Sequence, residues 1–224
     1  MQYVTLGKTG ITVNKNGFGA LPIQRISFDE AAAVLRRAYD GGVRYFDTAR
    51  FYTDSEAKIA YALGDVRSDI YIATKSMATA VADFKEQLET SLKELGTDYV
   101  DVMQFHNLPF CPVPGHESGL YEAMLEAKEK GKVRHIGITT HKIDLAREAI
   151  ESGLYETLQY PFSYLAAPEE VELVKMCRER NMGFICMKGM AGGLIRSGRA
   201  SYAYISQFDN ALPIWGVQKM EEIE

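Results

Sequence analysis

Eight short runs of β-forming residues follow one another along this chain, and a segment with helical periodicity separates each run from the next. The runs begin 24 to 33 residues apart, which is the length of one strand, one helix and their two connections. They cover residues 17–20, 43–47, 70–75, 100–106, 133–138, 157–160, 183–187 and 211–215. This alternation predicts an α/β fold with a parallel sheet.

The helical segments between these runs have recognisable ends. Ser27 and Glu30 have the spacing of a capping box ahead of an apolar face. Asp83 is expected to begin a helix that Gly96 ends, and Pro168 stands where a first helical turn tolerates proline. The helices therefore have start and stop signals of their own.

Eight strands are the number that closes a (β/α)₈ TIM barrel, and we expect this fold. The competing topology, an open doubly wound sheet, would be expected to show a GxGxxG motif directly after its first strand. Residues 17–22 read GFGALP instead, so that motif is lacking. Ahead of the first strand, residues 3–6 and 11–13 flank the turn GKTG, which predicts an N-terminal β-hairpin that covers the barrel floor.

The chain has 224 residues, which favours a single barrel domain over residues 1–224. It ends where an eighth helix is expected to begin, near Met220, so we expect a barrel that lacks its last helix. About five apolar side chains on the wall would then be exposed, at a cost of roughly 10 kcal/mol. Such a barrel is expected to be marginal unless a partner or a longer natural chain covers the wall.

Charge and cysteine content exclude several classes of function. The net charge of −5 argues against a nucleic-acid partner, because phosphate binding needs clustered Lys and Arg. No apolar stretch approaches the 18 residues of a membrane span, and the first residues do not resemble a secretory signal. The three cysteines form no CxxC pair, so neither a disulfide framework nor a metal site is expected. We expect a cytoplasmic protein, with a homo-oligomer among the assemblies that the sequence allows.

Polar residues follow three successive predicted strands. Asp47, Lys75 and His106 each end a strand, and Tyr52 comes five residues after Asp47. Active sites of (β/α)₈ barrels lie at these carboxyl ends. Each residue alone has a structural explanation, such as a helix cap or a buried histidine. Together at one barrel mouth they indicate a catalytic site, in which Asp47 and Lys75 form a buried ion pair.

These four residues suit proton donation to a carbonyl oxygen. The pKa of a tyrosine is ordinarily near 10, and an adjacent Lys75 ammonium is expected to lower it, with Asp47 holding that lysine charged. A neutral His106 can donate a hydrogen bond to the substrate oxygen. No side chain donates hydride, so a nicotinamide cofactor is expected to supply it.

Two other functions fit the same residues. A lysine at the end of a barrel strand can form a Schiff base, which would make the protein an aldolase that uses Lys75. The same fold could also serve as a non-catalytic subunit that senses a cofactor or binds a partner.

Four segments of the chain resemble the aldo-keto reductase family. GGVRYFDTARFYTDSEAKIAYAL, at residues 41–63, is similar to the family pattern around the second strand, and IYIATKS, VMQFHN and GKVRHIGITTH continue that pattern in order. The resemblance covers essentially the whole chain. It implies an NAD(P)H-dependent oxidoreductase that reduces a small aldehyde or ketone to an alcohol. The implied tetrad is Asp47, Tyr52 as the general acid, Lys75 and His106.

The resemblance also implies a set of cofactor-binding residues. Thr139 and Thr140 stand where the family has a Ser-Asn pair that holds the carboxamide, and Gln159 matches the family's glutamine. The remaining implied positions are Met187 under the nicotinamide, a pyrophosphate loop of Lys188, Gly189, Gly192 and Gly193, and an adenosine 2′-phosphate region with Gln218 and Lys219. The implied cofactor is NADP, and the residues leave NAD open.

MKGMAGGLI and PIWGVQKMEE are similar to one branch of this family, whose members carry a C-terminal ferredoxin-like segment with iron-sulfur clusters. An iron-sulfur cluster is therefore implied only for a longer form of the chain. Cys111, Cys177 and Cys186 cannot replace that segment and are expected to be small buried hydrophobes. The substrate stays open at this stage.

Overall fold

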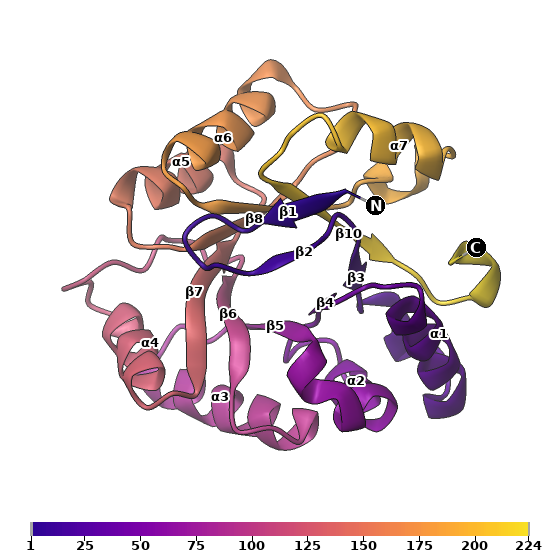
Figure 1. Ribbon diagram of the computed structural model, residues 1–224. Helices are drawn as coiled ribbons and strands as arrows, with labels where there is room; N and C mark the ends of the chain where they lie inside the picture. The colour runs from indigo at the N-terminus through magenta and orange to yellow at the C-terminus, as the bar shows by residue number, and fades with distance from the viewer. Residues whose placement is uncertain (1, 224) are drawn as a thin grey trace.

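The computed structural model describes residues 2–223, and its centre is a closed barrel of eight parallel strands (Figure 1). Each strand pairs with its neighbours in chain order, and the last pairs with the first. The strands are β3 (Gly17–Gly19), β4 (Tyr45–Asp47), β5 (Tyr71–Ser76), β6 (Val100–His106), β7 (Val133–Thr139), β8 (Thr157–Pro161), β9 (Gly183–Met187) and β10 (Ala211–Gly216). The predicted (β/α)₈ barrel is confirmed.

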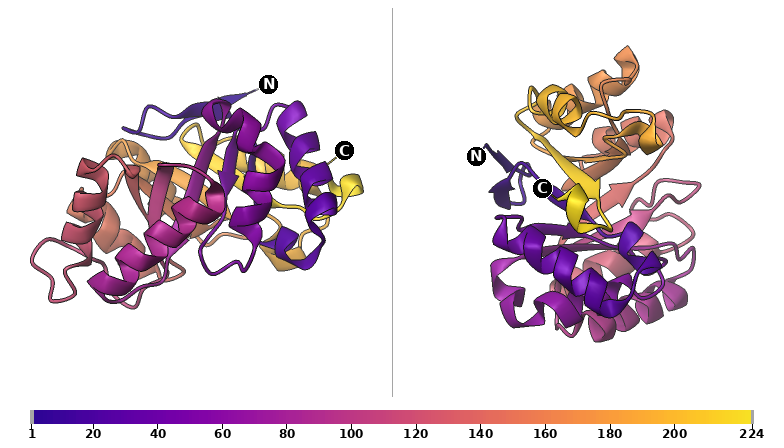
Figure 2. Two further views of the ribbon diagram at one scale, coloured as in Figure 1. Left: turned by 90° about the horizontal axis from the view of Figure 1, so that it is seen from below. Right: turned by 90° about the vertical axis from the view of Figure 1, so that its right-hand side faces the viewer.

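Helices surround the barrel on its outside, as the two views of Figure 2 show. They are α1 (Phe28–Asp40), α2 (Ser55–Leu63), α3 (Val81–Leu95), α4 (Leu120–Glu129), α5 (Ile143–Ser152), α6 (Pro168–Glu179) and α7 (Gly198–Ile205). Short 3₁₀ turns are η1 (Pro22–Arg25), η2 (Gly64–Asp69), η3 (Ala191–Gly193) and η4 (Met220–Glu222). Each helix packs its apolar face against the strands, so the larger core lies between the two layers.

Local chemistry explains the start of α1 and the end of α3. The Ser27 hydroxyl accepts a hydrogen bond from the Glu30 amide at 3.3 Å, and the Glu30 carboxylate accepts one from the Ser27 amide at 2.8 Å. This is the predicted capping box. Gly96 ends α3 with a φ of 61°, a left-handed conformation that glycine adopts without strain.

Two predicted boundaries were wrong by two residues. Helix α3 begins at Val81 rather than Asp83, and the acidic Asp83 instead stabilises its first turn. Strand β4 begins at Tyr45 rather than Val43, because the Val43 amide donates to the Ala38 carbonyl at 3.0 Å and so still belongs to the end of α1.

A second, smaller core fills the barrel interior. The antiparallel hairpin of β1 (Tyr3–Thr5) and β2 (Thr12–Asn14) lies across the amino ends of the strands (Figure 1). Its apolar side chains pack with inward-facing strand residues in one cluster: Val4, Leu6, Ile11, Val13, Tyr45, Ala73, Val102, Ile185, Leu212 and Ile214. The hairpin therefore closes the floor, as predicted, and leaves the opposite mouth open.

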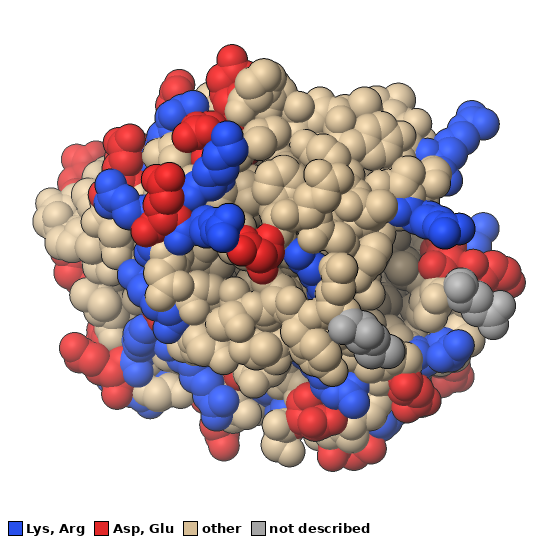
Figure 3. Space-filling model, turned by 45° about the horizontal axis from the view of Figure 1, so that its top comes forward, with Lys and Arg blue, Asp and Glu red and all other residues tan. Residues whose placement is uncertain are grey.

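The segment after β10 is a 3₁₀ turn rather than an α-helix within the described residues. It lies beside α1 (Figure 1), and Ile223 packs against the outer core. Cys111, Cys177 and Cys186 are free and buried, as expected. No helix within residues 2–223 combines the length and apolar content that crossing a bilayer requires. On the face shown in Figure 3, acidic and basic side chains are interspersed.

Candidate active site

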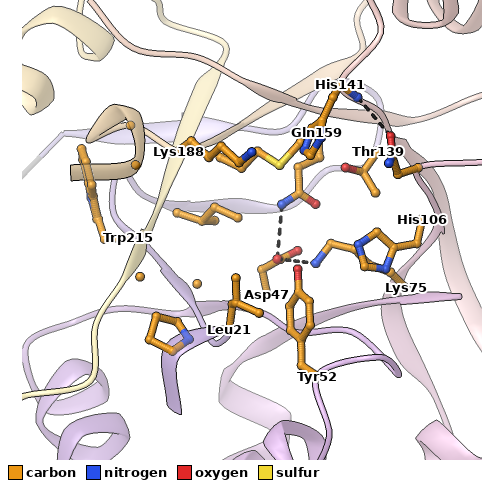
Figure 4. A pocket seen from close by; sticks show the side chains of 18 of the residues that line it. Leu21, Asp47, Tyr52, Lys75, His106, Thr139, His141, Gln159, Lys188 and Trp215 are labelled. Atoms are coloured by element: carbon orange, nitrogen blue, oxygen red, sulfur yellow. Dashed lines mark hydrogen bonds and ion pairs between the residues drawn. The ribbon is translucent and has the colours of Figure 1, made fainter. Parts of the chain in front are cut away.

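A cavity of about 600 Å³ opens at the carboxyl ends of the barrel strands (Figure 4). All four residues of the predicted tetrad line it: Asp47, Tyr52, Lys75 and His106. They come from β4, the loop after β4, β5 and β6, which are neighbours in the barrel. Barrel closure and parallel pairing therefore bring together side chains that lie as far as 59 residues apart in the chain.

The Lys75 ammonium and the Asp47 carboxylate form an ion pair at the base of the cavity. Lys75 Nζ lies 2.5 Å from Asp47 Oδ1, and it also donates to the Thr48 carbonyl at 2.6 Å. Both charged side chains are almost completely buried. A buried charge is tolerated when it is paired and hydrogen-bonded, and this pair meets both conditions.

Two glutamines complete the surroundings of Asp47. Gln104 Nε2 donates to Asp47 Oδ2 at 3.1 Å, and Gln159 Nε2 donates to Asp47 Oδ1 at 3.2 Å. Gln104 lies on β6, where it pairs in register with Lys75. The sequence analysis did not identify Gln104; its signal was an amide in the middle of an apolar strand. The carboxylate is thus held from three sides.

Tyr52 lies above this pair, with its hydroxyl directed toward Asp47 and Lys75 (Figure 4). Lys75 Nζ is 5.0 Å from the centroid of the Tyr52 ring. The His106 ring meets the same ring edge-on, with centroids 5.8 Å apart and an interplanar angle of 84°. The structure therefore brings the phenol, the ammonium and the imidazole to one point of the cavity.

The pKa of Tyr52 differs from the sequence expectation. Burial raises this pKa above its ordinary value, Lys75 lowers it and Asp47 raises it, with a net upward result. The lowering by Lys75 that the sequence analysis expected is present, but desolvation of the phenolate outweighs it. At neutral pH the phenol consequently keeps its proton.

His106 is neutral at physiological pH. Burial and the nearby positive charge of Lys75 lower its pKa to about 3, with a further contribution from His141. Its Nδ1 is buried and has no hydrogen-bond partner among the described residues. The neutral imidazole that the sequence analysis expected is therefore the form present in the folded protein.

A second buried network braces the loop that carries Tyr52. Glu56 Oε1 accepts a hydrogen bond from Thr74 Oγ1 at 2.6 Å, and the other carboxylate oxygen pairs with the Arg50 guanidinium. The Arg50 amide also donates to the Lys75 carbonyl at 3.0 Å. These contacts tie the loop on both sides of Tyr52 to β5. The sequence analysis missed this network, since nothing in the spacing marked Glu56 as buried.

Most of the implied cofactor residues lie on the side of the cavity opposite Tyr52. Those that line it are Thr139, Gln159, Met187, Lys188, Gly189, Gly192 and Gly193. Thr140 is buried beside the cavity, where its hydroxyl accepts from the Lys142 amide at 3.1 Å. Gln218 and Lys219 do not line the cavity. Their backbone amides donate to Glu222 Oε2 at 2.9 and 3.0 Å.

Two observations test whether these residues fit a nicotinamide nucleotide. Gln159 lines the cavity, and its Oε1 has no hydrogen-bond partner among the described residues, which leaves this acceptor for a ligand. Gly192 and Gly193 have φ values of 67° and 97°, and a Cβ built on either would meet no atom within 4 Å. Their backbone is thus accessible to a phosphate group. The residues fit the cofactor.

Trp215 is a further lining residue that the sequence analysis did not assign. Its indole Nε1 donates to Asn16 Oδ1 at 3.0 Å, and a Cβ added to Gly189 would lie 2.8 Å from its ring. It is the one tryptophan of the chain. No group of three or more His, Cys, Asp or Glu side chains that could hold a metal ion occurs within residues 2–223.

Comparison with known proteins agrees with this geometry. The sequence profile of the Aldo/keto reductase family matches residues 15–224, and the chain belongs to that family. It is 28% identical over 209 residues to L-galactose dehydrogenase from Arabidopsis thaliana, covering 85% of this chain and 66% of that protein. It is 36% identical over 148 residues to methylglyoxal reductase DkgB from Salmonella typhi, covering 62% of this chain and 52% of that protein. The chain thus spans about half to two thirds of these relatives' lengths.

Solved structures share the fold. An aldo-keto reductase from Klebsiella pneumoniae in complex with NADPH superposes with a TM-score of 0.83 at 20% identity, covering 99% of this chain and 87% of that one. A putative aldo-keto reductase from Pseudomonas superposes with a TM-score of 0.85 at 22% identity, covering 99% and 90%. At these identities the likeness establishes the barrel architecture.

Proposed function

We propose that this protein is an NAD(P)H-dependent oxidoreductase that reduces an aldehyde or ketone to an alcohol. The observation that carries the proposal is the buried Asp47–Lys75 ion pair directly beneath the Tyr52 hydroxyl, with the His106 ring at the edge of the phenol. An ion pair at the bottom of a cavity, next to a protonated phenol, is suited to donating a proton to a substrate oxygen.

Tyr52 is the proton donor in this mechanism. Its raised pKa keeps the phenol protonated until the carbonyl oxygen gains negative charge. Lys75 then stabilises the phenolate that proton transfer leaves behind, and Asp47 holds the Lys75 side chain in place. Neutral His106 donates a hydrogen bond to the substrate oxygen and so orients the carbonyl toward Tyr52.

Several lining residues would hold the cofactor, which supplies the hydride when bound. Gln159 and Thr139 would bind the carboxamide and Met187 would support the nicotinamide ring. Lys188 and the backbone of Gly189, Gly192 and Gly193 would bind the diphosphate. We propose NADP as the cofactor, supported by family membership and by the NADPH-bound structure that shares the fold. The roles of Thr140, Gln218 and Lys219 toward the cofactor stay predictions.

The aldolase alternative is poorly supported by the contacts of Lys75. A Schiff base requires a neutral, nucleophilic amine. Lys75 Nζ instead donates to the Asp47 carboxylate and the Thr48 carbonyl, so it is engaged in hydrogen bonds rather than free to attack a carbonyl carbon. The three free, buried cysteines suit a reducing cytoplasm, where we place the protein.

The test is the variant Tyr52→Phe, assayed by aldehyde-dependent oxidation of NADPH and of NADH. We expect kcat to fall by about 100-fold or more, because general-acid catalysis contributes that much. Cofactor affinity, measured by quenching of Trp215 fluorescence, is expected to stay within about twofold because the hydroxyl lies on the substrate side. Equal kcat in the wild type and the variant would show that Tyr52 is not the proton donor.

A further inference from the structure

Gln104 is a fully buried amide on β6, where it stands between the apolar residues Met103 and Phe105. Its Nε2 donates to Asp47 Oδ2 at 3.1 Å, whereas its Oε1 is buried and has no hydrogen-bond partner within residues 2–223. A buried acceptor without a partner costs free energy that an apolar side chain of the same shape avoids. Among the described residues, the bond to Asp47 is thus the one hydrogen bond that this side chain makes.

The neighbouring strands hold the Gln104 side chain tightly in the barrel interior. Gly137 of β7 pairs in register with Gln104. A Cβ built on Gly137 would lie only 2.9 Å from Gln104 Cγ and 2.4 Å from Thr157 Oγ1, so a larger residue there would displace both side chains. On its other side Gln104 pairs in register with Lys75 of β5. The amide is therefore packed beside the Asp47–Lys75 ion pair.

We propose that Gln104 is a positioning residue for proton transfer, which it assists by fixing the Asp47 carboxylate. This inference rests on the proposed function and adds a residue to the same site. Lys75 and Gln159 both donate to Asp47 Oδ1, at 2.5 and 3.2 Å, and among the described residues only Gln104 donates to Oδ2. The last torsion of an aspartate side chain is broad, so bonds to one oxygen leave the carboxylate free to rotate. A bond to each oxygen restricts that rotation.

Rotation of Asp47 would affect the proposed reaction through Lys75, which this carboxylate holds. Lys75 Nζ lies 5.0 Å from the centroid of the Tyr52 ring, and the Tyr52 hydroxyl is directed toward the ion pair (Figure 4). A Lys75 ammonium that shifts with Asp47 stabilises the phenolate less well, and a shift of about 1 Å can lower a rate about 100-fold. Gln104 itself does not line the cavity. We therefore expect it to affect kcat rather than the binding of ligands.

The experiment compares Gln104→Met with Thr157→Val in the reduction by NADPH of the aldehyde that the wild type reduces fastest. Met copies the unbranched shape of Gln without its hydrogen-bonding groups. We expect kcat to fall about tenfold in Gln104→Met, with the Kd for NADPH unchanged within about twofold. Thr157→Val is the matched control, because Thr157 Oγ1 is also buried and lacks a hydrogen-bond partner among the described residues, Asp47 included. A wild-type kcat in Gln104→Met, or an equal loss in Thr157→Val, would contradict the proposal.

Stability separates a positioning role from a purely structural one. Gln104→Met removes a hydrogen bond from Asp47 Oδ2, and it also removes the unpartnered Oε1 of Gln104. These two changes have opposite effects of similar size on the free energy of unfolding. We therefore expect the urea midpoint to fall by less than about 0.3 M while kcat falls. A larger fall of the midpoint would show that Gln104 supports the fold as a whole, and the positioning role would be rejected.

The variant Gln104→Glu adds a pH profile as a second readout. A protonated glutamic acid can donate to Asp47 Oδ2 as the amide does, whereas an ionised one repels that carboxylate. The charged groups beside this position are Asp47 on β4 and Lys75 on β5, and β7 and β8 face it with uncharged residues. Two carboxylates that share a buried site raise the pKa of one of them.

We expect the kcat of Gln104→Glu, divided by that of the wild type, to be highest at pH 5 and to fall as the pH rises to 9. Tyr52 and His106 both stay uncharged over this range, because the pKa of Tyr52 is raised and that of His106 is about 3. The expected fall therefore belongs to the introduced carboxyl group. A ratio that does not change with pH would overturn the proposal.

Crystal structures of the wild type and of Gln104→Met separate this inference from the proposed function. Should no carbonyl compound be reduced, the proposed function fails, and the orientation of Asp47 in the two crystals tests the role of Gln104 alone. A carboxylate plane rotated by about 30° or more in the variant supports the positioning role. A smaller rotation contradicts it.

Discussion

The mouth of this barrel has two unlike halves. Around β3, β4 and β5, ion pairs and hydrogen bonds are buried under the surface, and the loops present apolar side chains to the cavity. Around β7, β8 and β9, the polar side chains of Thr139, His141, Gln159 and Lys188 line the cavity together with Met187 and Met190, and the loop after β9 is exposed. The first half positions the groups proposed for proton transfer. The second half offers hydrogen-bonding groups to a large ligand.

Positive φ values are concentrated in the second half, although Thr53 in the Tyr52 loop also has one, of 43°. Lys188, Ala191, Gly192 and Gly193 all have positive φ values, between 48° and 97°. Such a conformation costs a non-glycine residue of order 1 kcal/mol and is maintained where it serves a function. The comparison between the two halves shows that buried side-chain networks hold the residues proposed for the chemistry in place. The proposed cofactor side instead exposes main-chain groups.

The largest expected effect contrasts one lysine from each half. Lys75→Met is expected to lower the free energy of unfolding by about 3–5 kcal/mol, because Asp47 would remain buried without its cation. Lys188→Met, in the exposed loop after β9, is expected to change it by less than about 0.5 kcal/mol. Urea unfolding followed by far-ultraviolet circular dichroism measures both. Equal losses in the two variants would remove the distinction between the halves.

The buried network of Glu56, which holds the Tyr52 loop, gives the next largest effect. Glu56→Ala is expected to cost about 1–3 kcal/mol of unfolding free energy, since Thr74 and Arg50 lose their buried acceptor. We also expect kcat to fall by about tenfold, because Tyr52 is no longer held in place. The control is Glu129→Ala at the exposed end of α4. Unchanged stability and kcat in Glu56→Ala would show that the loop is positioned by other contacts.

The two glutamines that donate to Asp47 test the comparison on the proposed cofactor side. Both donate to the same carboxylate, yet only Gln159 lines the cavity. Gln159→Leu is therefore expected to raise the Kd for NADPH about tenfold, or about 1.4 kcal/mol, while Gln104→Leu changes it less than about twofold. Titrations followed by Trp215 fluorescence measure both values. Similar losses in the two variants would mean that the glutamines act only through Asp47.

A further expected effect is a pH dependence of stability at His106. Its pKa is about 3 in the folded protein and near 6.5 in the unfolded chain, so between these values the unfolded chain binds the additional proton. Stability consequently falls as the pH is lowered below about 6.5, by at most about 1.4 kcal/mol per pH unit. Urea unfolding at pH 5 and pH 7 measures this slope. His106→Gln is expected to reduce it, and an unreduced slope would assign it to other groups such as His141, whose pKa is also lowered.

Much of the architecture was predictable because its signals are local. Neighbouring residues determine the alternation of strands and helices, the capping box at Ser27 and the helix end at Gly96. The meeting of the predicted site residues was predictable for a related reason: Asp47 and His106 end their strands, Lys75 is one residue from the end of its strand, and parallel strands place such ends on one face. Boundaries such as Tyr45 were less predictable, since Val43 can pair either with a sheet or with the preceding helix.

By itself, the amino-acid order determined the barrel, the face on which its polar strand ends meet, and the residue types available there. Only the tertiary structure decided how buried those residues are, because burial depends on neighbours that are distant in the chain. Gln104 and Gln159 reach Asp47 across 57 and 112 positions, and burial outweighs Lys75 in raising the pKa of Tyr52. The difference between the two halves of the mouth likewise arises from closing the sheet, which brings non-periodic loops side by side.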